Sequence, residues 1–402
     1  MLLRAFLARR SKLGAAFAVA ALLLSPRLVG AQPLRLRGDA LVQTRSPVGL
    51  LVLRGEDRLR PWLDAEAVTW LGITNTPDAT GDVVTLSVRA RHARSGSELR
   101  LGRMIVSMGA VRPLHLDGAR GLVRVFGGTT LEAFGGFPVQ RRFDYRAFDW
   151  AAGGRVGQSV GDRAQIGASY LLRRTDDRRS DEEAGADMAL TPAPWLTAAG
   201  RVAFDLVTPG PTDALGSVSA QKRDVRVELL VTHRSPGRLL PSTSLFSMLG
   251  DYAATSVGST LRWRAFPRLE LVATGSAQAQ GGEVGGQGLG RATLALDDGW
   301  AGTLGVEVRR VDFGSARWTG ARAMLSLPVS ARLRVATELE LVRPDEPGDR
   351  GALWPWALGA LGYRPVPGWE VAAGVEASSG PTYRAETHAL ARLSYAFERS
   401  GP

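Results

Sequence analysis

The sequence predicts an all-β fold: a single transmembrane, antiparallel, up-and-down β-barrel of about 18–22 strands behind an N-terminal signal peptide. Three observations carry this prediction. Apolar and charged residues alternate with a period of two in many segments, and short turns alternate with longer loops between them. Beyond residue 31, no apolar run reaches the roughly 18 residues of a transmembrane helix. We expect a signal peptide at residues 1–31 and a barrel at residues 32–402.

The first 31 residues have the three regions of a secretory signal peptide. Basic residues at positions 4, 9, 10 and 12 precede the apolar run Leu13–Leu24, and the small residues of Val29–Ala31 offer a cleavage site before Gln32. The segment holds five basic residues and no acidic one, so its removal takes the formal charge from +11 to +6. This ordinary remainder argues against nucleic acid as a partner. The chain also has no cysteine, which excludes disulfides and thiolate sites.

Period-two segments predict the strands. In residues 331–342 the charged residues hold positions 332, 334, 338 and 340, while leucine and valine hold positions 333, 335, 339 and 341. A strand points these two sets to opposite faces. The same separation predicts strands at Leu34–Arg45, Ala164–Arg173, Leu196–Asp205 and Val225–Arg234.

Two kinds of connection separate the strands, as in outer-membrane barrels. The strands of a soluble sandwich or propeller would also alternate apolar and polar residues. Their apolar face would be rich in large residues, whereas alanine, valine and leucine dominate here. Tight turns are expected at Thr191–Pro194, Ala265–Arg268, Asp297–Gly299, Leu327–Ser330 and Arg364–Gly368, and longer loops at Thr175–Ala184, His233–Asp251, Gly281–Gly288 and Arg343–Leu353. Tryptophans near them predict interfacial aromatic girdles: Trp195, Trp263, Trp300, Trp318, Trp354, Trp356 and Trp369.

The charged strand face predicts a water-filled lumen. Unpaired ions cannot be packed into a dry core, and a bilayer leaves no sheet edge unsatisfied, so the sheet must close around water. An excess of arginine on this wall favours anionic cargo. The expected lumen residues are Arg35, Arg37, Arg173, Arg201, Arg226, Arg262, Arg264, Arg332 and Arg334, partly compensated by Glu228, Glu338 and Glu340.

The segment Phe137–Trp150 is a candidate constriction. It combines Arg141, Arg142 and Arg146 with Tyr145 and other aromatic residues. Folded into the barrel, it would present guanidinium groups and aromatic faces to an anionic or sugar-like cargo. The alternative is a solvated loop with an interfacial aromatic cluster.

The C-terminal segment Ala389–Phe397 resembles the last strand of Gram-negative outer-membrane porin-like β-barrels, although Glu398–Pro402 follows the aromatic residue on which the family usually ends. The runs Leu99–Arg103, Leu116–Gly118 and Phe134–Gly136 are similar to strands and turns of such barrels. The resemblance implies integral insertion into the cell outer membrane by the barrel-assembly machinery. The chain also resembles the porin-type exporters of anionic exopolysaccharide, which implies a periplasmic polysaccharide-export protein as a further partner.

Other candidate chemistry is sparse. The four histidines, His92, His115, His233 and His388, lack metal-ligand spacing, and we interpret His388 as one polar lumen residue among many. Asp64 and Glu66 are interpreted as lumen wall, Asp181–Glu183 as a solvated loop, and Gly281–Gly288 as a surface loop. We expect no catalytic site, no metal and no cofactor.

These observations favour passive translocation of polar or anionic cargo through an arginine-rich lumen, with a tilt toward exopolysaccharide export. General diffusion of small solutes is the first alternative. A barrel that conducts nothing and anchors a surface or motility complex is the second.

Overall fold

The computed structural model describes residues 34–44, 48–73, 79–139, 149–175, 178–235, 253–314, 316–346, 352–380 and 385–399. These residues form 22 strands and one short 3₁₀ helix, η1 (Phe126–Gly128). The strands are β1 (Leu34–Gln43), β2 (Val48–Arg60), β3 (Leu63–Ile73), β4 (Ala79–Arg91), β5 (Glu98–Val106), β6 (Leu114–Arg124), β7 (Thr129–Pro138), β8 (Trp150–Val160), β9 (Ala164–Thr175), β10 (Arg178–Ala193), β11 (Leu196–Asp205), β12 (Gly210–Lys222), β13 (Val225–Arg234), β14 (Ala254–Phe266), β15 (Leu269–Gln280), β16 (Glu283–Ala295), β17 (Thr303–Phe313), β18 (Ala316–Pro328), β19 (Leu333–Pro344), β20 (Trp354–Tyr363), β21 (Trp369–Ser378) and β22 (Glu386–Arg399).

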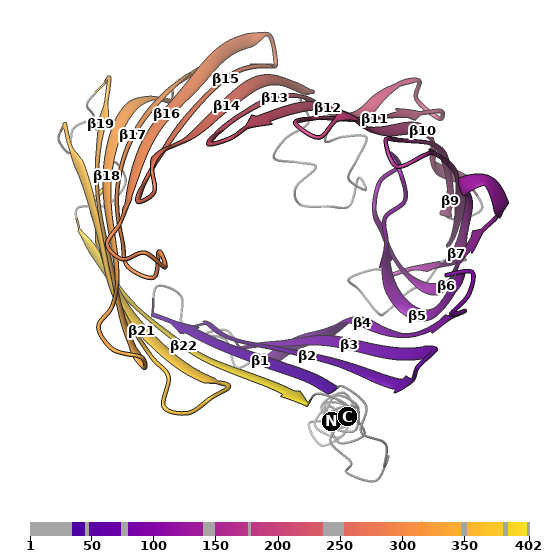
Figure 1. Cartoon of the computed structure of the whole chain (residues 1–402), viewed down its shortest axis with the longest axis horizontal. Helices are drawn as coiled ribbons and strands as arrows, with labels where there is room; N and C mark the ends of the chain where they lie inside the picture. Colours follow the sequence, from indigo (N-terminus) through magenta and orange to yellow (C-terminus); the bar gives the residue numbers. More distant parts are fainter. Residues whose placement is uncertain are drawn as a thin grey trace, which may run out of the picture.

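The sheet closes on itself because its first and last strands pair. Leu34 of β1 lies opposite Arg399 of β22, and the antiparallel register continues to Gln43 and Leu390. All other pairings join strands that are consecutive in the sequence, and Figure 1 shows the resulting ring. The fold is therefore an all-β, closed, 22-stranded, antiparallel up-and-down barrel. It agrees with the predicted class and lies at the upper end of the expected strand range.

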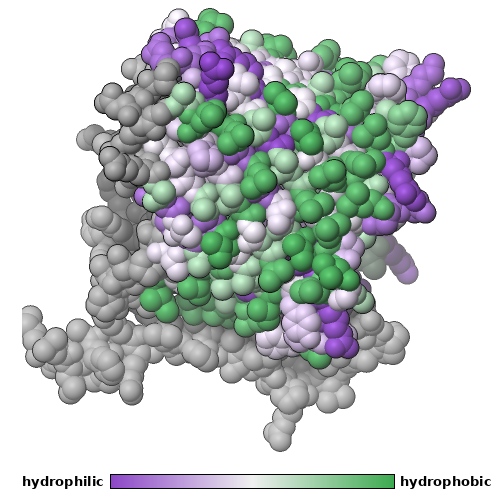
Figure 2. Space-filling view, turned by 90° about the vertical axis from the view of Figure 1, so that its left-hand side faces the viewer, coloured by the Kyte–Doolittle hydropathy of each residue, from purple (hydrophilic) through white to green (hydrophobic). Residues whose placement is uncertain are grey.

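Alternation along each strand gives the barrel an apolar outer face. On β13, Leu229 and Val231 are 53% and 47% exposed and point outward, while Arg226 and Glu228 hold the opposite face. Figure 2 shows hydrophobic side chains over much of the outer surface on the side that carries β17–β19. The period of two that predicted β11 and β13 also gave their bounds correctly.

The connections differ between the two ends of the barrel. We call the end where β1 begins and β22 finishes the terminus end, and the other the loop end. Connections at the terminus end have at most seven residues, as in 296–302, whereas the loop end carries the longest two, 139–149 and 235–253. Several loop-end connections are nevertheless tight, such as 281–282.

Two expected loops are mostly strand. Thr175–Ala184 contains only a short connection before β10 begins at Arg178, and most of Gly281–Gly288 lies in β16. The glycines of β16 pair with β15 on one side and, from Gly286 onward, with β17 on the other. Pairing of this kind outweighs the poor strand preference of glycine. Arg332 was expected on the lumen face of a strand, and this expectation is also wrong. The strand β19 begins at Leu333, and Arg332 lies in the connection 329–332.

Candidate functional site

The inner face of the barrel carries ion pairs that link neighbouring strands. Arg35 of β1 lies 2.8 Å from the carboxylate of Glu398 on β22, so the pair spans the closing junction. Arg201 of β11 lies 2.8 Å from Asp213 of β12. Such pairs hold guanidinium groups on the wall in fixed positions, where their planar N–H donors can meet a passing polar group.

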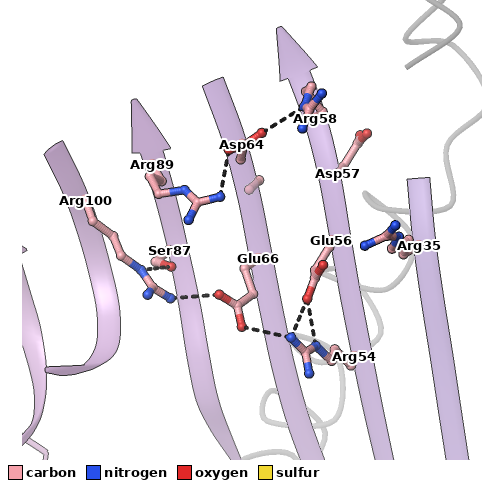
Figure 3. Close-up of a pocket in the computed structure, with 11 residues that line it drawn as sticks. Arg35, Arg54, Glu56, Asp57, Arg58, Asp64, Glu66, Ser87, Arg89 and Arg100 are labelled. Carbon is pink, nitrogen blue, oxygen red and sulfur yellow. Dashed lines mark hydrogen bonds and ion pairs between the residues drawn. The ribbon is translucent and has the colours of Figure 1, made fainter. Parts of the chain in front are cut away.

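This wall contains a cavity of 390 Å³ over β1–β5 (Figure 3). Glu66 of β3 is its centre, because its carboxylate accepts a bond of 2.8 Å from Arg100 and lies 4.0 Å from Arg54. Asp64 lies 2.8 Å from Arg89. The lining residues are Arg35, Arg54, Glu56, Asp57, Arg58, Asp64, Ala65, Glu66, Ser87, Arg89 and Arg100.

Charges in this cavity nearly cancel. Five arginines face four acidic residues, and the acidic ones are divided among the arginines rather than gathered. Arg54 donates to Glu56, Arg100 also donates to Ser87 at 2.8 Å, and Arg58 lies 3.4 Å from Asp64. The arrangement therefore offers many fixed hydrogen-bond donors and acceptors with little net charge, which suits hydrated, hydroxyl-rich or mixed-charge cargo.

A segment that the sequence did not single out lies inside the barrel. The connection 107–113 between β5 and β6 folds onto the inner face of β9 and β10, and Figure 1 shows this connection inside the ring. Its Arg112 binds Glu183 of β10 through a side-chain ion pair of 2.7 Å and a backbone N–H bond of 3.0 Å, and also lies 2.8 Å from Asp181. The carboxylate of Glu183 is fully buried there.

An apolar cluster fixes the same segment. Met108 and Val111 of the segment are 2% and 4% exposed, and they pack with residues of β5–β9. The cluster comprises Met104, Val106, Met108, Val111, Leu114, Leu116, Phe134, Ala151 and Leu171. Burial of these side chains gives the inward position a hydrophobic driving force in addition to the ion pair.

Asp181–Glu183 was expected to be a solvated loop, and that expectation is wrong. The three residues lie in β10, where Arg112 and Arg173 on other elements supply the positive charge that the burial of Asp181 and Glu183 requires. Glu182 instead pairs with Arg179 of the same strand. Sequence reasoning missed Arg112 because its partner is 71 residues away.

The expected lumen arginines are distributed around the ring rather than gathered in one site. Eight of the nine lie in strands, each on the face opposite the apolar one: Arg35, Arg37, Arg173, Arg201, Arg226, Arg262, Arg264 and Arg334. Arg226 and Arg262 are direct partners across β13 and β14, and they approach Glu228 and Glu270 at 3.3 and 3.8 Å. The loop candidates Arg141, Arg142, Tyr145 and Arg146 lie outside the described residues.

Further arginines of the wall were not predicted. Arg54, Arg58, Arg89 and Arg100 line the cavity on β2, β4 and β5. A signal existed for the first two, because charged residues occupy positions 54, 56, 58 and 60 of β2, although Asp57 interrupts the alternation. The compensating residues Glu338 and Glu340 do pair with arginines, but those are Arg322 and Arg309.

Five of the seven tryptophans expected in a girdle divide between two roles. Trp195, Trp263 and Trp369 are 40–55% exposed near the terminus end, as expected of an interfacial girdle. Trp318 and Trp356 instead face inward, and the guanidinium carbons of Arg309 and Arg322 lie 5.7 and 5.6 Å from their ring centres. Their place in a girdle was a wrong expectation, since a cation–π contact with a charged wall residue holds each ring inside.

The histidines are separate from one another in the part of the chain that is described. His388 contacts Glu386 at 3.1 Å, His115 contacts the Val84 carbonyl at 2.6 Å, and His92 and His233 contact hydroxyl groups. Among the described residues, no three His, Asp or Glu side chains form a group that could hold a metal. Over the same ranges, no helix has the length and apolar character needed to cross a membrane.

Comparisons with known proteins identify the fold alone. No protein-family model matches the chain, and no curated protein matches it in sequence. The translocation pore of the P pilus usher PapC is similar with a TM-score of 0.51 at 10% identity, over 91% of this chain and 99% of that one.

Siderophore receptors of Pseudomonas aeruginosa are also similar in structure. A mutant of the ferric enterobactin receptor PfeA has a TM-score of 0.59 at 10% identity, over 92% of this chain and 81% of the receptor. The receptor PirA has a TM-score of 0.59 at 8% identity, over 92% and 80%. The chain thus has the architecture of bacterial outer-membrane barrels.

Proposed function

We propose that the chain is an integral outer-membrane channel that passively translocates polar or anionic cargo through an arginine-rich aqueous lumen. The observation that carries this proposal is the closed ring with an apolar outside and an ion-paired inside, which is the arrangement that a bilayer and a water-filled passage together require. The likeness in fold to an outer-membrane usher pore and to outer-membrane receptors supports the location. The role proposed is that of a passage, without catalysis.

The width of the ring supports a passage for large cargo. A circular barrel of 22 strands, spaced about 4.8 Å apart and tilted by about 40°, would be roughly 44 Å across between backbones. One layer of wall side chains cannot fill such a ring. The inward segment 107–113 narrows it over β9 and β10 without spanning it.

We favour an exopolysaccharide as the cargo. A wall of alternating guanidinium and carboxylate groups binds sugar hydroxyls and acidic groups through many weak contacts, as a sliding polymer requires. Export would also involve a periplasmic polysaccharide-export protein, and insertion the barrel-assembly machinery. General diffusion of small solutes is the second candidate, and it is favoured by the near balance of charge around the cavity over β1–β5.

Electrical recording tests the channel proposal. The barrel, reconstituted into a planar bilayer, should give a stable conductance with a weak preference for anions, because most wall arginines are paired with carboxylates. A barrel that stays silent over the whole voltage range would contradict the proposal and favour the non-conducting anchor. Deletion of the gene should remove a surface glycan and leave small-solute uptake unchanged if the cargo is a polymer, whereas general diffusion predicts the reverse.

A further inference from the structure

The barrel wall changes its construction between β4 and β5. Within the described wall, the two backbones pair from Arg91 and Glu98 only as far as Leu86 and Arg103. Beyond this point β4 continues toward the loop end paired with β3, and β5 continues to Val106 paired with β6. Residues 79–85 therefore have no backbone ladder toward β5. We call this place the seam.

Glycines allow β5 to leave β4. Gly102 has a φ of +117°, and a Cβ on it would collide with the carbonyl oxygen of Leu86. Gly102 pairs directly with Gly118 of β6, which pairs with Gly136 of β7. This row of three glycines is a crease in the wall, beyond which β5 and β6 lead into the inward segment 107–113.

Polar side chains close the seam in place of the missing ladder. Arg103 binds Asp117 of β6 with two bonds, from Nε at 2.8 Å and from Nη2 at 3.0 Å. Its Nη1 donates to the carboxylate of Asp82 and to the carbonyl of Val83 on β4, both at 3.1 Å. The carboxylate of Asp82 also accepts the Val83 N–H at 2.7 Å.

A histidine completes this substitution. His115 of β6 lies with Nε2 2.6 Å from the carbonyl oxygen of Val84, so Nε2 carries the proton and donates it. The backbone carbonyls of Val83 and Val84 on β4 therefore accept hydrogen bonds from side chains, which can rotate. In a continuous ladder they would accept them from the backbone N–H groups of the next strand, which are fixed.

The seam lies within the apolar band of the outer face. Leu101 and Ile105 flank Arg103 on the same side of β5, and each is 51% exposed. The Arg103 side chain itself is 14% exposed. Ionisable groups at this depth of a barrel wall are costly, so they indicate a functional role.

We propose that the seam is a lateral binding site for an amphiphile whose headgroup carries an ammonium beside a phosphate. Its acyl chain would lie along the apolar outer face near Leu101 and Ile105. The guanidinium of Arg103 and the carboxylates of Asp82 and Asp117 together give the seam a formal net charge of −1. Arg103 matches the phosphate and Asp82 matches the ammonium, whereas a purely anionic headgroup would meet excess negative charge. This inference rests on one part of the proposed function, the insertion of the barrel into a bilayer, and it does not require the barrel to conduct.

Native mass spectrometry with two lysolipids tests this. Lysophosphatidylethanolamine and lysophosphatidylglycerol of equal chain length are titrated onto the whole purified barrel in a non-ionic detergent. We expect the ethanolamine lipid to bind about tenfold more tightly, which is the lower end of the value of one charge-assisted contact. Asp82→Asn should abolish this preference, and Arg103→Gln should weaken the binding of both lipids.

Two controls make the outcome decisive. Asp312→Asn removes a carboxylate from an ion pair elsewhere on the barrel and should leave the preference unchanged. Phosphoethanolamine without an acyl chain should bind far more weakly; equal binding would overturn the assignment to a lipid. Equal affinities of the wild-type barrel for the two lysolipids would overturn the charge argument without the use of any variant. Planar-bilayer conductance is a separate readout, so a failed channel proposal and a failed seam proposal are distinguishable.

Discussion

The guanidinium group of Arg112 lies 2.7 Å from the fully buried carboxylate of Glu183, although the two residues are 71 positions apart in the chain. One belongs to an inward connection and the other to a wall strand that sequence patterns did not identify. Their pairing, together with the apolar cluster around Met108, holds the connection 107–113 against the inner face of the wall.

Replacing Arg112 with glutamine should release this connection and destabilise the barrel. The change leaves the Glu183 carboxylate buried without its cation, and breaking such a pair costs about 3–5 kcal/mol. We expect a lower midpoint of urea unfolding in lipid vesicles and a larger, noisier single-channel conductance. Arg179→Gln is the control, since Arg179 pairs with Glu182 while 64% exposed and should change stability by less than about 1 kcal/mol. Equal effects of the two variants would contradict the buried-pair argument.

The glycine crease should tolerate no side chain. A Cβ on Gly118 would lie 2.7 Å from the Cα of Gly136, so Gly118→Ala must push β6 and β7 apart. We expect poor assembly, measured as loss of the heat-modifiable folded band on gel electrophoresis. Gly121→Ala, on the same strand, meets no atom within 4 Å and should assemble normally. Normal assembly of the Gly118 variant would show that the crease is not needed.

Ion selectivity should respond in opposite directions to two neighbouring substitutions. Glu66→Gln removes the carboxylate shared by Arg54 and Arg100, so the permeability ratio of chloride to potassium should rise. Arg100→Gln removes the cation and should lower that ratio. Reversal potentials in a salt gradient measure both, and a tenfold rise in salt on both sides should shrink the difference by screening. Shifts of the same sign would show that the cavity does not line the conducting path.

The connection 296–302 should loosen in acid. Backbone N–H groups of Gly302, Ala301 and Gly299 donate to the Asp297 carboxylate and hold its pKa below the ordinary value. Because the pKa is depressed in the folded chain, this stabilisation is complete above the ordinary aspartate pKa and is lost as the pH falls through the folded value. Hydrogen exchange at these amides should therefore accelerate in that window.

Asp297→Asn should remove this dependence on pH. The adjacent Asp298 is 90% exposed, and its carboxylate contacts only the Arg268 side chain within the described residues, so Asp298→Asn should leave the acid profile of the three amides unchanged. If the Asp297→Asn variant and the wild-type barrel had the same acid profile, the loosening of the connection 296–302 would have to come from another group.

Alternation predicted the faces of the strands well because it is a local property. Leu196–Asp205 and Val225–Arg234 have the bounds that were expected, and the arginines in them face inward as expected. Glycine and acidic residues misled the same reasoning in Gly281–Gly288 and Asp181–Glu183. Their strand conformation comes from the pairing of neighbouring backbones and from an arginine on a distant element, neither of which leaves a local pattern.

The sequence by itself determined that this chain is a closed β-barrel with an apolar outside, because a period of two and a charged face permit little else in a bilayer. Only the tertiary structure decided which charges meet. It brought Arg112 to Glu183, gathered Arg54, Arg89 and Arg100 around one cavity, and ended the ladder between β4 and β5. These contacts depend on register and on glycine-dependent bending of the wall, so residues far apart in the chain become neighbours only when the ring has closed.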